Sequence, residues 1–223
     1  MSGGLFYHFR AWRFCKKNSL NLWWDHQDGV QRFLERWGPK EKTLVLIGPS
    51  GGYSLPADFL ERFERIIAFE IDPVARLIFE KRFGIKPQWI KHPFQFEPFS
   101  DLPADAAILF CNLLGQVPFK NAKKMSLLLE AALKGRSWAS YHDAMSGENL
   151  EFDTENSTPG KRARLIQMKS WVYPKVNSGT LVVNAHQAPE LFERFPNDSF
   201  FYWQWRILPK RTHLIEGVYH AEK

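Results

Sequence analysis

The chain has 223 residues, 44% of them hydrophobic and 15% aromatic, so it can bury one large core but has little room for a second domain. Its two cysteines, Cys15 and Cys111, form no metal-binding spacing, which argues against a bound metal and indicates a reduced, cytoplasmic protein. No apolar stretch could span a bilayer and no cleavable signal is evident, whereas the formal net charge of +6 favours an acidic partner such as RNA without requiring one.

Two amphipathic helices are expected within residues 1–40. The first covers residues 5–17 and the second residues 28–37, and each has an apolar face that we expect to pack in the core. These faces consist of Leu5, Phe9 and Trp12 in the first helix and of Val30, Phe33, Leu34 and Trp37 in the second. Arg10 and Arg13 lie on the opposite face of the first helix, which we expect to be solvated. Residues 1–40 therefore form a predicted N-terminal helical extension.

An apolar strand then leads into a glycine-rich turn. The strand beginning near Thr43 runs into Gly48-Pro-Ser-Gly-Gly52, and the next apolar run along the chain ends in Glu70. Glycines allow a backbone to approach a ligand, the helix that follows offers free N–H groups, and a carboxylate at the tip of the next strand can accept both ribose hydroxyls. The segment therefore predicts a nucleoside-binding crevice.

Strands and helices alternate through the rest of the chain. Asp72-Pro73 begins a helix, as N-cap and first-turn proline, and Gly84 ends it. The further expected elements are strands over 88–90, 106–111 and 137–141, a helix capped by Asn121, a strand over 179–184, a short helix over 189–195, and strands over 200–208 and 211–219. This alternation predicts an α/β fold, with a doubly wound, mostly parallel sheet closed by a terminal antiparallel hairpin.

The order of these motifs resembles the class I S-adenosylmethionine-dependent methyltransferases over residues 43–143. The three glycine positions of that family's first loop are held here by Gly48, Ser50 and Gly52. Glu70 falls on the acid that holds the ribose, whereas Leu46 stands where the family usually has a further acid. The resemblance implies seven strands in the order 3-2-1-4-5-7-6, S-adenosyl-L-methionine as cofactor and methyl transfer as the reaction.

The resemblance also implies which residues bind the cofactor. They are Gly48, Pro49, Ser50, Gly52, Glu70, Ile71, Phe94, Gln95 and Asn112. Glu70 is expected to accept hydrogen bonds from the ribose, Phe94 to stack on the adenine, and Gln95 to hydrogen-bond its edge. Among the glycines, Gly48 and Gly52 are expected to let the backbone approach the ligand.

Asn112 and His142 are the candidate catalytic residues, because each follows or ends a strand at the predicted site. In family members that methylate nitrogen, the place of Asn112 begins an Asp/Asn-Pro-Pro-aromatic motif, but residues 113–115 lack the prolines and the ring, so nitrogen methylation of a base or glutamine is not indicated. His142 and Asp143 together offer an acid–base pair, in which the histidine could deprotonate an acceptor near neutral pH.

The acceptor itself is left open between a small molecule and RNA. We expect one domain over residues 1–223, with a cofactor-binding core over 43–143 and a region of lid, insertion and closing strands over 144–223. Residues 146–175, which include the basic run 161–164, are the expected lid or substrate loop. We expect this segment and the N-terminal helices to choose the acceptor and to take no part in cofactor binding.

Two other functions remain open. Gly48-Pro-Ser-Gly-Gly52 also fits the G-x-S-x-G nucleophile elbow of α/β-hydrolases, with Ser50 as nucleophile, Asp143 as the acid, and His186 or His213 as the base of a serine esterase. That elbow normally follows several earlier strands, which this chain does not offer. The departures at Leu46 and Ser50 would also suit a non-catalytic protein that binds a nucleoside or acts as an interaction module.

Overall fold

The fold is seen in a computed structural model of the chain. It describes residues 4–15, 22–94, 102–114, 122–152, 154, 172–174, 183–185 and 199–221. The predicted site residue Gln95, the basic run 161–164, the helix cap at Asn121 and the short helix over 189–195 all lie outside the described residues.

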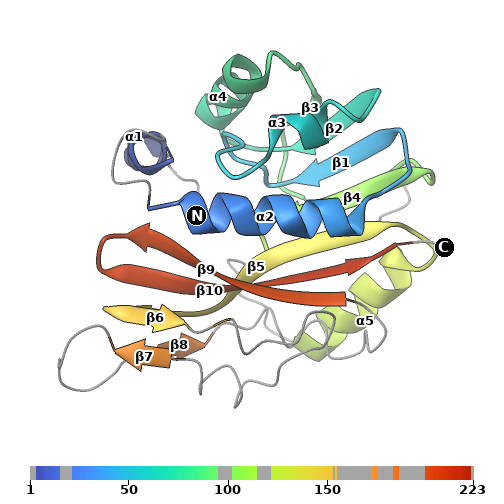
Figure 1. Cartoon of the computed structure of the whole chain (residues 1–223). Helices are drawn as coiled ribbons and strands as arrows, with labels where there is room; N and C mark the ends of the chain where they lie inside the picture. Colours follow the sequence, from blue (N-terminus) through green and yellow to red (C-terminus); the bar gives the residue numbers. More distant parts are fainter. Residues whose placement is uncertain are drawn as a thin grey trace.

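One mixed sheet forms the centre of the molecule (Figure 1). Its strands are, in spatial order, β3 (Gln88–Ile90), β2 (Arg65–Phe69), β1 (Thr43–Ile47), β4 (Ala106–Cys111), β5 (Trp138–Glu148), β10 (Arg211–His220) and β9 (Ser199–Leu208). The first five are parallel to one another, and β10 runs antiparallel to both of its neighbours. In chain order these seven strands read 3-2-1-4-5-7-6, so the predicted order and the terminal hairpin are confirmed.

Three short strands lie beside this path. β8 (Val183–Ala185) pairs antiparallel with the far end of β5, and β6 (Leu150–Phe152) pairs antiparallel with β7 (Val172–Pro174) in a separate small sheet. β5 is longer than the predicted strand over 137–141, because β10 pairs along it as far as Glu148.

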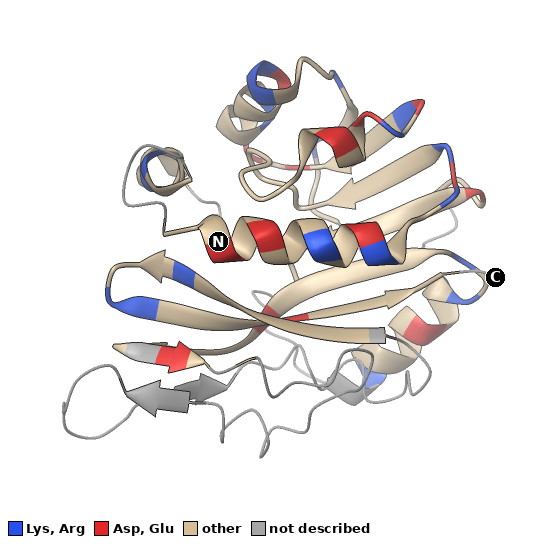
Figure 2. Ribbon diagram, viewed as in Figure 1, with Lys and Arg blue, Asp and Glu red and all other residues tan. Residues whose placement is uncertain are grey.

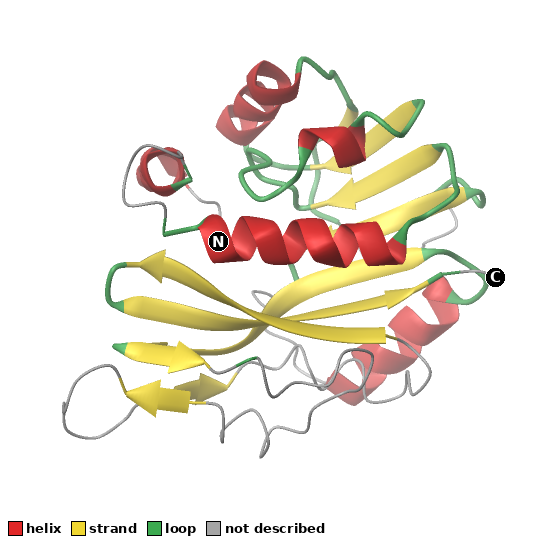
Figure 3. Ribbon diagram, in the orientation of Figure 1, coloured by secondary structure: helices red, strands yellow, loops and turns green. Residues whose placement is uncertain are grey.

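Helices cover both faces of the sheet, as Figure 3 shows. One face is covered by α1 (Gly4–Phe14), α2 (Trp24–Trp37), the short α3 (Ala57–Leu60) and α4 (Pro73–Phe83), and the other by α5 (Ala122–Leu133). β1 and β4 carry no charged residue and are buried, as strands covered on both sides must be (Figure 2). We call the two sides the α2 face and the α5 face.

α4 begins and ends as its sequence predicts. The Asp72 carboxylate accepts hydrogen bonds from the backbone N–H groups of Val74 (2.8 Å) and Ala75 (3.4 Å), and Pro73 occupies the first turn. Gly84 ends the helix in the left-handed conformation, with φ of 66°. This places the start of α4 directly after Glu70, at the end of β2.

The N-terminal helices agree only in part with their predicted faces. The predicted stripe of α2 is buried as expected. In α1, however, Leu5, Phe9 and Trp12 are 73%, 61% and 50% exposed, so their predicted place in the core is wrong. The buried side of α1 instead carries His8 and Phe14, because the polar ring of His8 finds hydrogen-bond partners inside.

Charged residues are distributed over many elements rather than gathered on one (Figure 2). Within the described ranges, no helix is long and apolar enough to cross a membrane. Among those same residues, His, Cys, Asp and Glu side chains form no group of three that could hold a metal ion.

Candidate cofactor and active site

The predicted site residues meet at one edge of the sheet, where the parallel strands end. In the strand register, Ile47 at the end of β1 pairs with Phe69 of β2 and with Phe110 of β4. Gly48 and Glu70 are the next residues of their strands, so they lie side by side at the carboxyl ends of β1 and β2. This is the edge at which open α/β sheets bind ligands.

Glu70 ties the glycine turn to the start of α4. Its Oε2 accepts a hydrogen bond from the backbone N–H of Ser50 and its Oε1 from that of Asp72, both at 2.9 Å. Burial raises the pKa of Glu70, and these two hydrogen bonds partly oppose that effect. Each carboxylate oxygen has a second lone pair, so the group can still accept hydrogen bonds from a diol. Asp72 already caps α4, so that task does not fall to Glu70.

The turn after β1 has an unusual backbone. Gly48, Ser50 and Gly52 all have positive φ, of 69°, 53° and 65°. A residue with a side chain pays about 1–2 kcal/mol for this conformation, so Ser50 stands where glycine would be easier. The hydrogen bond from its backbone N–H to Glu70 offsets part of that cost. The buried Pro49 completes the turn by accepting a hydrogen bond from Gly52 N–H at 3.0 Å.

Gly48 and Gly52 lack side chains for different reasons. A Cβ on Gly52 would collide with the ring of Phe83 and lie 3.0 Å from Phe79, so the site is filled by α4 and not open to a ligand. The expectation that Gly52 lets a ligand approach is therefore wrong. A Cβ on Gly48 would lie 3.4 Å from the Leu113 side chain, an ordinary van der Waals contact, so Leu113 packs over Gly48.

Two of the predicted cofactor residues present apolar surface near this crevice. Ile71 directly follows Glu70 and is 46% exposed, an unusual position for a large aliphatic side chain. Phe94 is partly buried and packs edge-on against Phe69 (5.1 Å between ring centroids) and Phe110 (5.9 Å). The ring of Phe94 is thus part of the core below the carboxyl ends of β2 and β4.

α1 reaches the same loops, which the sequence did not predict. Nε2 of His8 donates to Oδ2 of Asp72 at 3.0 Å, and its Nδ1 accepts from the hydroxyl of Tyr53 at 3.1 Å. Burial raises the pKa of Tyr7, and the nearby Ser50 side chain opposes that effect. No spacing signal could have found these contacts, because Tyr7 and His8 lie far from the loops in sequence. α1 thus lies against the loops of the predicted cofactor half, and the expectation that the N-terminal helices take no part in cofactor binding stays a prediction.

Asn112 lies at the end of β4, with a φ of 51°, and is almost fully buried. Its Oδ1 accepts a hydrogen bond from the backbone N–H of Asp143 at 3.1 Å, and its own N–H donates to Tyr141 O at 2.9 Å. The side-chain Oδ1 of Asn112 is thus already used in a hydrogen bond that joins the end of β4 to β5. Its side-chain NH2 is the group that can donate to a ligand.

His142 is not the rim residue that the sequence predicts. Its ring is fully buried, Nδ1 accepts from Ser140 Oγ at 3.1 Å, and Nε2 donates to Oε1 of Glu216 at 3.1 Å. Glu216 also accepts from the Tyr202 hydroxyl at 2.6 Å. A general base must reach the proton that it removes, and both nitrogens of His142 are engaged inside the sheet, so its proposed catalytic role is corrected to a structural one.

Asp143, the next residue, has a different partner. Its Oδ1 lies 3.1 Å from Nδ1 of His213 on β10, and both side chains are on the α2 face. Ser50, the nucleophile of the hydrolase alternative, is engaged with Glu70 and not with any histidine in the hydrogen bonds of the described residues. His186, the other candidate base, lies outside the described residues.

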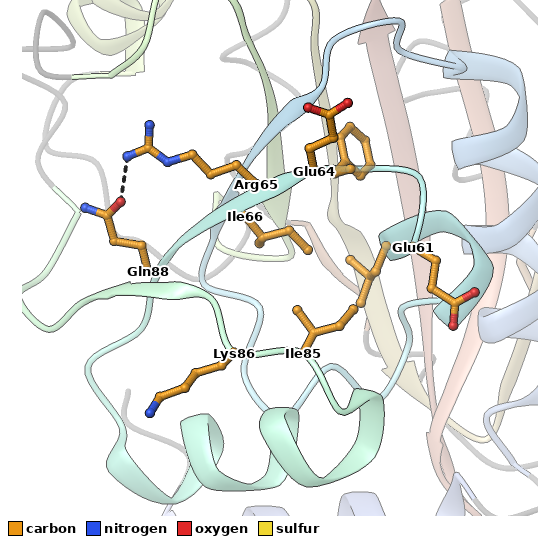
Figure 4. A pocket seen from close by; sticks show the side chains of 9 residues that line it. Glu61, Glu64, Arg65, Ile66, Ile85, Lys86 and Gln88 are labelled. Carbon is orange, nitrogen blue, oxygen red and sulfur yellow. Dashed lines mark hydrogen bonds between the residues drawn. The ribbon is translucent and has the colours of Figure 1, made fainter.

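A separate shallow pocket lies at the opposite end of the strands (Figure 4). It is formed around the start of β2 and the segment before β3, where Arg65 donates to Gln88 at 2.6 Å. None of the predicted site residues lines it. The predicted site therefore lies at the carboxyl ends of the strands and not in this pocket.

The order and directions of the strands decide the fold. It is the class I methyltransferase fold. Solved structures that are similar to the chain include magnesium protoporphyrin IX methyltransferase from Synechocystis PCC 6803 with bound SAM, at 10% identity and a TM-score of 0.47, covering 95% of this chain and 90% of that one. Another is the N-methyltransferase NodS from Bradyrhizobium japonicum WM9 with S-adenosyl-L-homocysteine, at 11% identity and a TM-score of 0.48, covering 97% and 98%.

A SAM-dependent methyltransferase from Aquifex aeolicus is similar at 12% identity and a TM-score of 0.46, covering 95% of this chain and 96% of that one. No protein-family model and no curated protein sequence matches the chain. The assignment of the class I methyltransferase fold rests on the strand order and directions, and a fold by itself does not establish a reaction.

Proposed function

We propose that the protein binds S-adenosyl-L-methionine at the carboxyl ends of β1, β2 and β4 and transfers its methyl group to an acceptor. The observation that carries this proposal is the position of Glu70, whose partly buried carboxylate joins the backbone of the glycine turn to the start of α4. A carboxylate held in this way, beside Gly48, is suited to accept the two hydroxyls of a ribose.

The residues around Glu70 fit a nucleoside. Leu113 packs against Gly48, and Ile71 offers exposed apolar surface next to the acid. Asn112 can donate from its side-chain amide at the end of β4. Leu46, by contrast, is fully buried in the α2 face and contributes nothing to the turn. The chain therefore supplies ribose and base contacts from the predicted loops.

When bound, S-adenosyl-L-methionine supplies a methyl group on a positively charged sulfur, which an acceptor can attack directly. The chain then has to align the acceptor and exclude water, and no covalent residue is required. α1 suits the second task, because His8 holds it against the loops that carry Asp72 and Tyr53. The two cysteines of the chain are free thiols, which supports a reducing, cytoplasmic location.

Calorimetric titration of the purified protein with S-adenosylhomocysteine tests the proposal. We expect one-site binding that is weakened by Glu70→Ala and spared by Glu64→Ala, an exposed acid at the other end of β2 that pairs with Lys42. If the folded wild-type protein binds neither S-adenosylmethionine nor its product, the methyltransferase proposal fails and a non-catalytic role on the same fold takes its place.

A further inference from the structure

Beside the proposed cofactor site, a second group of aromatic and polar side chains gathers on the α2 face. Its members come from five elements, α1, α2, β5, β9 and β10. They are Tyr7, His26, Tyr141, Asp143, Trp205 and His213. We call this group the aromatic cluster. A core can be packed with apolar side chains alone. The buried polar side chains of this cluster therefore need an explanation.

His213 and Asp143 form its polar centre. Nδ1 of His213 lies 3.1 Å from Oδ1 of Asp143, and both side chains are more than nine-tenths buried. The backbone N–H of Asp143 donates to Asn112, so the carboxylate is anchored at the carboxyl ends of β4 and β5. The two atoms approach at ion-pair distance, and the carboxylate beside the ring helps to orient it. This is the arrangement of an oriented proton acceptor.

Flat rings form a wall beside this pair. The ring of Trp205 stacks on His26, with centroids 4.3 Å apart and planes 14° from parallel, and lies 5.9 Å from the ring of His213. Trp203 donates its indole N–H to Nδ1 of His26 at 3.0 Å. Burial lowers the pKa of His26 to about 3, so this ring is neutral and behaves as an aromatic surface.

The indole N–H of Trp205 adds an observation that points to a ligand. Trp205 is 5% exposed, and its Nε1 has no hydrogen-bond acceptor among the described residues. A buried donor left without an acceptor costs about 1–3 kcal/mol, so it is rare unless something else supplies the acceptor. An oxygen atom of a bound molecule would do so, next to His213.

Tyr7 connects the aromatic cluster to the cofactor loops. Its phenol lies near the Ser50 side chain. Burial is the main cause that raises the pKa of Tyr7, and the negative charges of Glu70 and Asp143 add to it, which means that the phenol is within electrostatic reach of both carboxylates. A molecule held against Trp205 and His213 would thus lie beside the proposed methyl donor.

We infer that the aromatic cluster is the acceptor site, and that the acceptor is a small planar molecule with an acidic hydroxyl group, such as a phenol. The inference rests on the proposed methyl transfer. The acceptor oxygen forms a bond to the methyl carbon, the sulfur–carbon bond breaks with its electron pair left on sulfur, and the hydroxyl proton passes to Nε2 of His213. Asp143 stabilises the imidazolium that forms, and the proton is then released to water. Trp205 holds an oxygen of the acceptor through its N–H.

Phenol binding gives the first test, with catechol and 4-nitrophenol as probes titrated into the protein in the presence of S-adenosylhomocysteine. We expect saturable binding that Trp205→Phe weakens by about tenfold, because the ring remains and only the donor is lost. Trp24→Phe, an exposed tryptophan of α2, is the matched control and should bind like the wild type. Equal affinity of Trp205→Phe and wild type, or no phenol binding at all, would overturn the inference.

Methyl transfer to the same phenols gives the second test, and the rate is measured from the S-adenosylhomocysteine that is released. His213→Gln should lower kcat/KM by about 10²–10⁴-fold, while S-adenosylhomocysteine affinity stays unchanged. Among the described residues, Asp143 from β5 and His26 from α2 face His213, and burial keeps His26 neutral. A kcat/KM of His213→Gln equal to that of the wild type would refute its role as base.

The two proposals fail separately. If S-adenosylhomocysteine binds but the phenols do not, the acceptor site is wrong and the cofactor site stands. If S-adenosylhomocysteine does not bind to the folded protein, the proposed function itself fails, and the aromatic cluster loses its reaction with it.

Discussion

His142 and Asp143 are neighbours in β5, but their side chains lie on opposite faces of the sheet. His142 pairs with Glu216 on the α5 face, and Asp143 lies against His213 on the α2 face. Successive residues of a strand point to opposite sides, so adjacency in sequence separates these two groups instead of joining them. Each finds its partner on β10, which pairs with β5 along its length.

This separation predicts that His142 stabilises the fold and does not act on the acceptor. His142→Phe would leave the buried Glu216 with the Tyr202 hydroxyl as its remaining partner among the bonds described here. Losing a hydrogen bond to a buried carboxylate should cost about 1–3 kcal/mol in the free energy of unfolding, measured in urea. S-adenosylhomocysteine affinity should remain that of the wild type. A stable variant that binds the cofactor but transfers no methyl group would return His142 to the active site.

Glu70 should make cofactor affinity depend on pH. Its carboxylate form accepts hydrogen bonds, and burial places its pKa above the ordinary value of 4.5. As the pH falls through that raised pKa, protonation removes acceptor capacity, so S-adenosylhomocysteine should bind more weakly at acidic pH than at neutral pH. Glu70→Ala should lower affinity by about tenfold or more at neutral pH and abolish this pH dependence. Calorimetry at several pH values measures both effects. If acidification lowers the affinity of Glu70→Ala as much as that of the wild type, the pH dependence belongs to another group.

Gly52 should be sensitive to substitution because of packing. Gly52→Ala places a methyl group into Phe83 and Phe79 and must hold a positive φ, which together should cost about 2–4 kcal/mol of unfolding free energy. Gly84→Ala is the matched control, because Gly84 has nearly the same φ, 66°, and nothing within 4 Å of the new carbon. It should cost only the backbone strain, about 1–2 kcal/mol. Equal losses in the two variants would show that the collision is relieved by movement of the rings.

His26 should make the fold sensitive to acid. Its pKa is about 3 in the folded protein and near 6.5 when unfolded, so between these values the unfolded chain binds one more proton. Stability is therefore lost as the pH falls below 6.5, by about 1.4 kcal/mol per pH unit from this residue. His26→Phe should unfold more easily at neutral pH, since Trp203 loses its acceptor, but should show a shallower loss between about pH 6.5 and 5 in urea titrations. A slope equal to that of His92→Gln, which removes an exposed histidine, would contradict the prediction.

The sequence was informative where local rules decide the structure. Asp72, Pro73 and Gly84 delimit α4 by backbone chemistry alone, and the uninterrupted apolar runs of β1 and β4 indicate buried strands. It was less informative where contacts join distant segments. His8 is 64 residues from Asp72, and the apolar stripe opposite it on α1 was the more obvious candidate for the core.

The candidate site divides in the same way. Glu70 follows from strand order and a terminal acid, whereas the pairing of Asp143 with His213 requires β5 and β10 to be adjacent and in register. Glycine is also required at position 52 because of Phe79 and Phe83, which belong to α4, a helix that comes later in the chain. Pattern and order could thus predict that Glu70 ends a parallel strand, but the contact of Asp143 with His213 depends on strand pairing over long sequence separations.

α1 should contribute to cofactor affinity, contrary to the expectation from sequence. His8→Phe keeps a ring of similar shape and removes the bonds to Asp72 and Tyr53, so α1 should detach more readily from the cofactor loops. S-adenosylhomocysteine affinity should fall by about threefold to tenfold, the scale of one hydrogen bond. Phe9→Ala, on the exposed side of the same helix, should bind like the wild type. If His8→Phe binds as tightly as Phe9→Ala in calorimetry, α1 serves only the acceptor side, and the cofactor site ends at the loops after β1, β2 and β4.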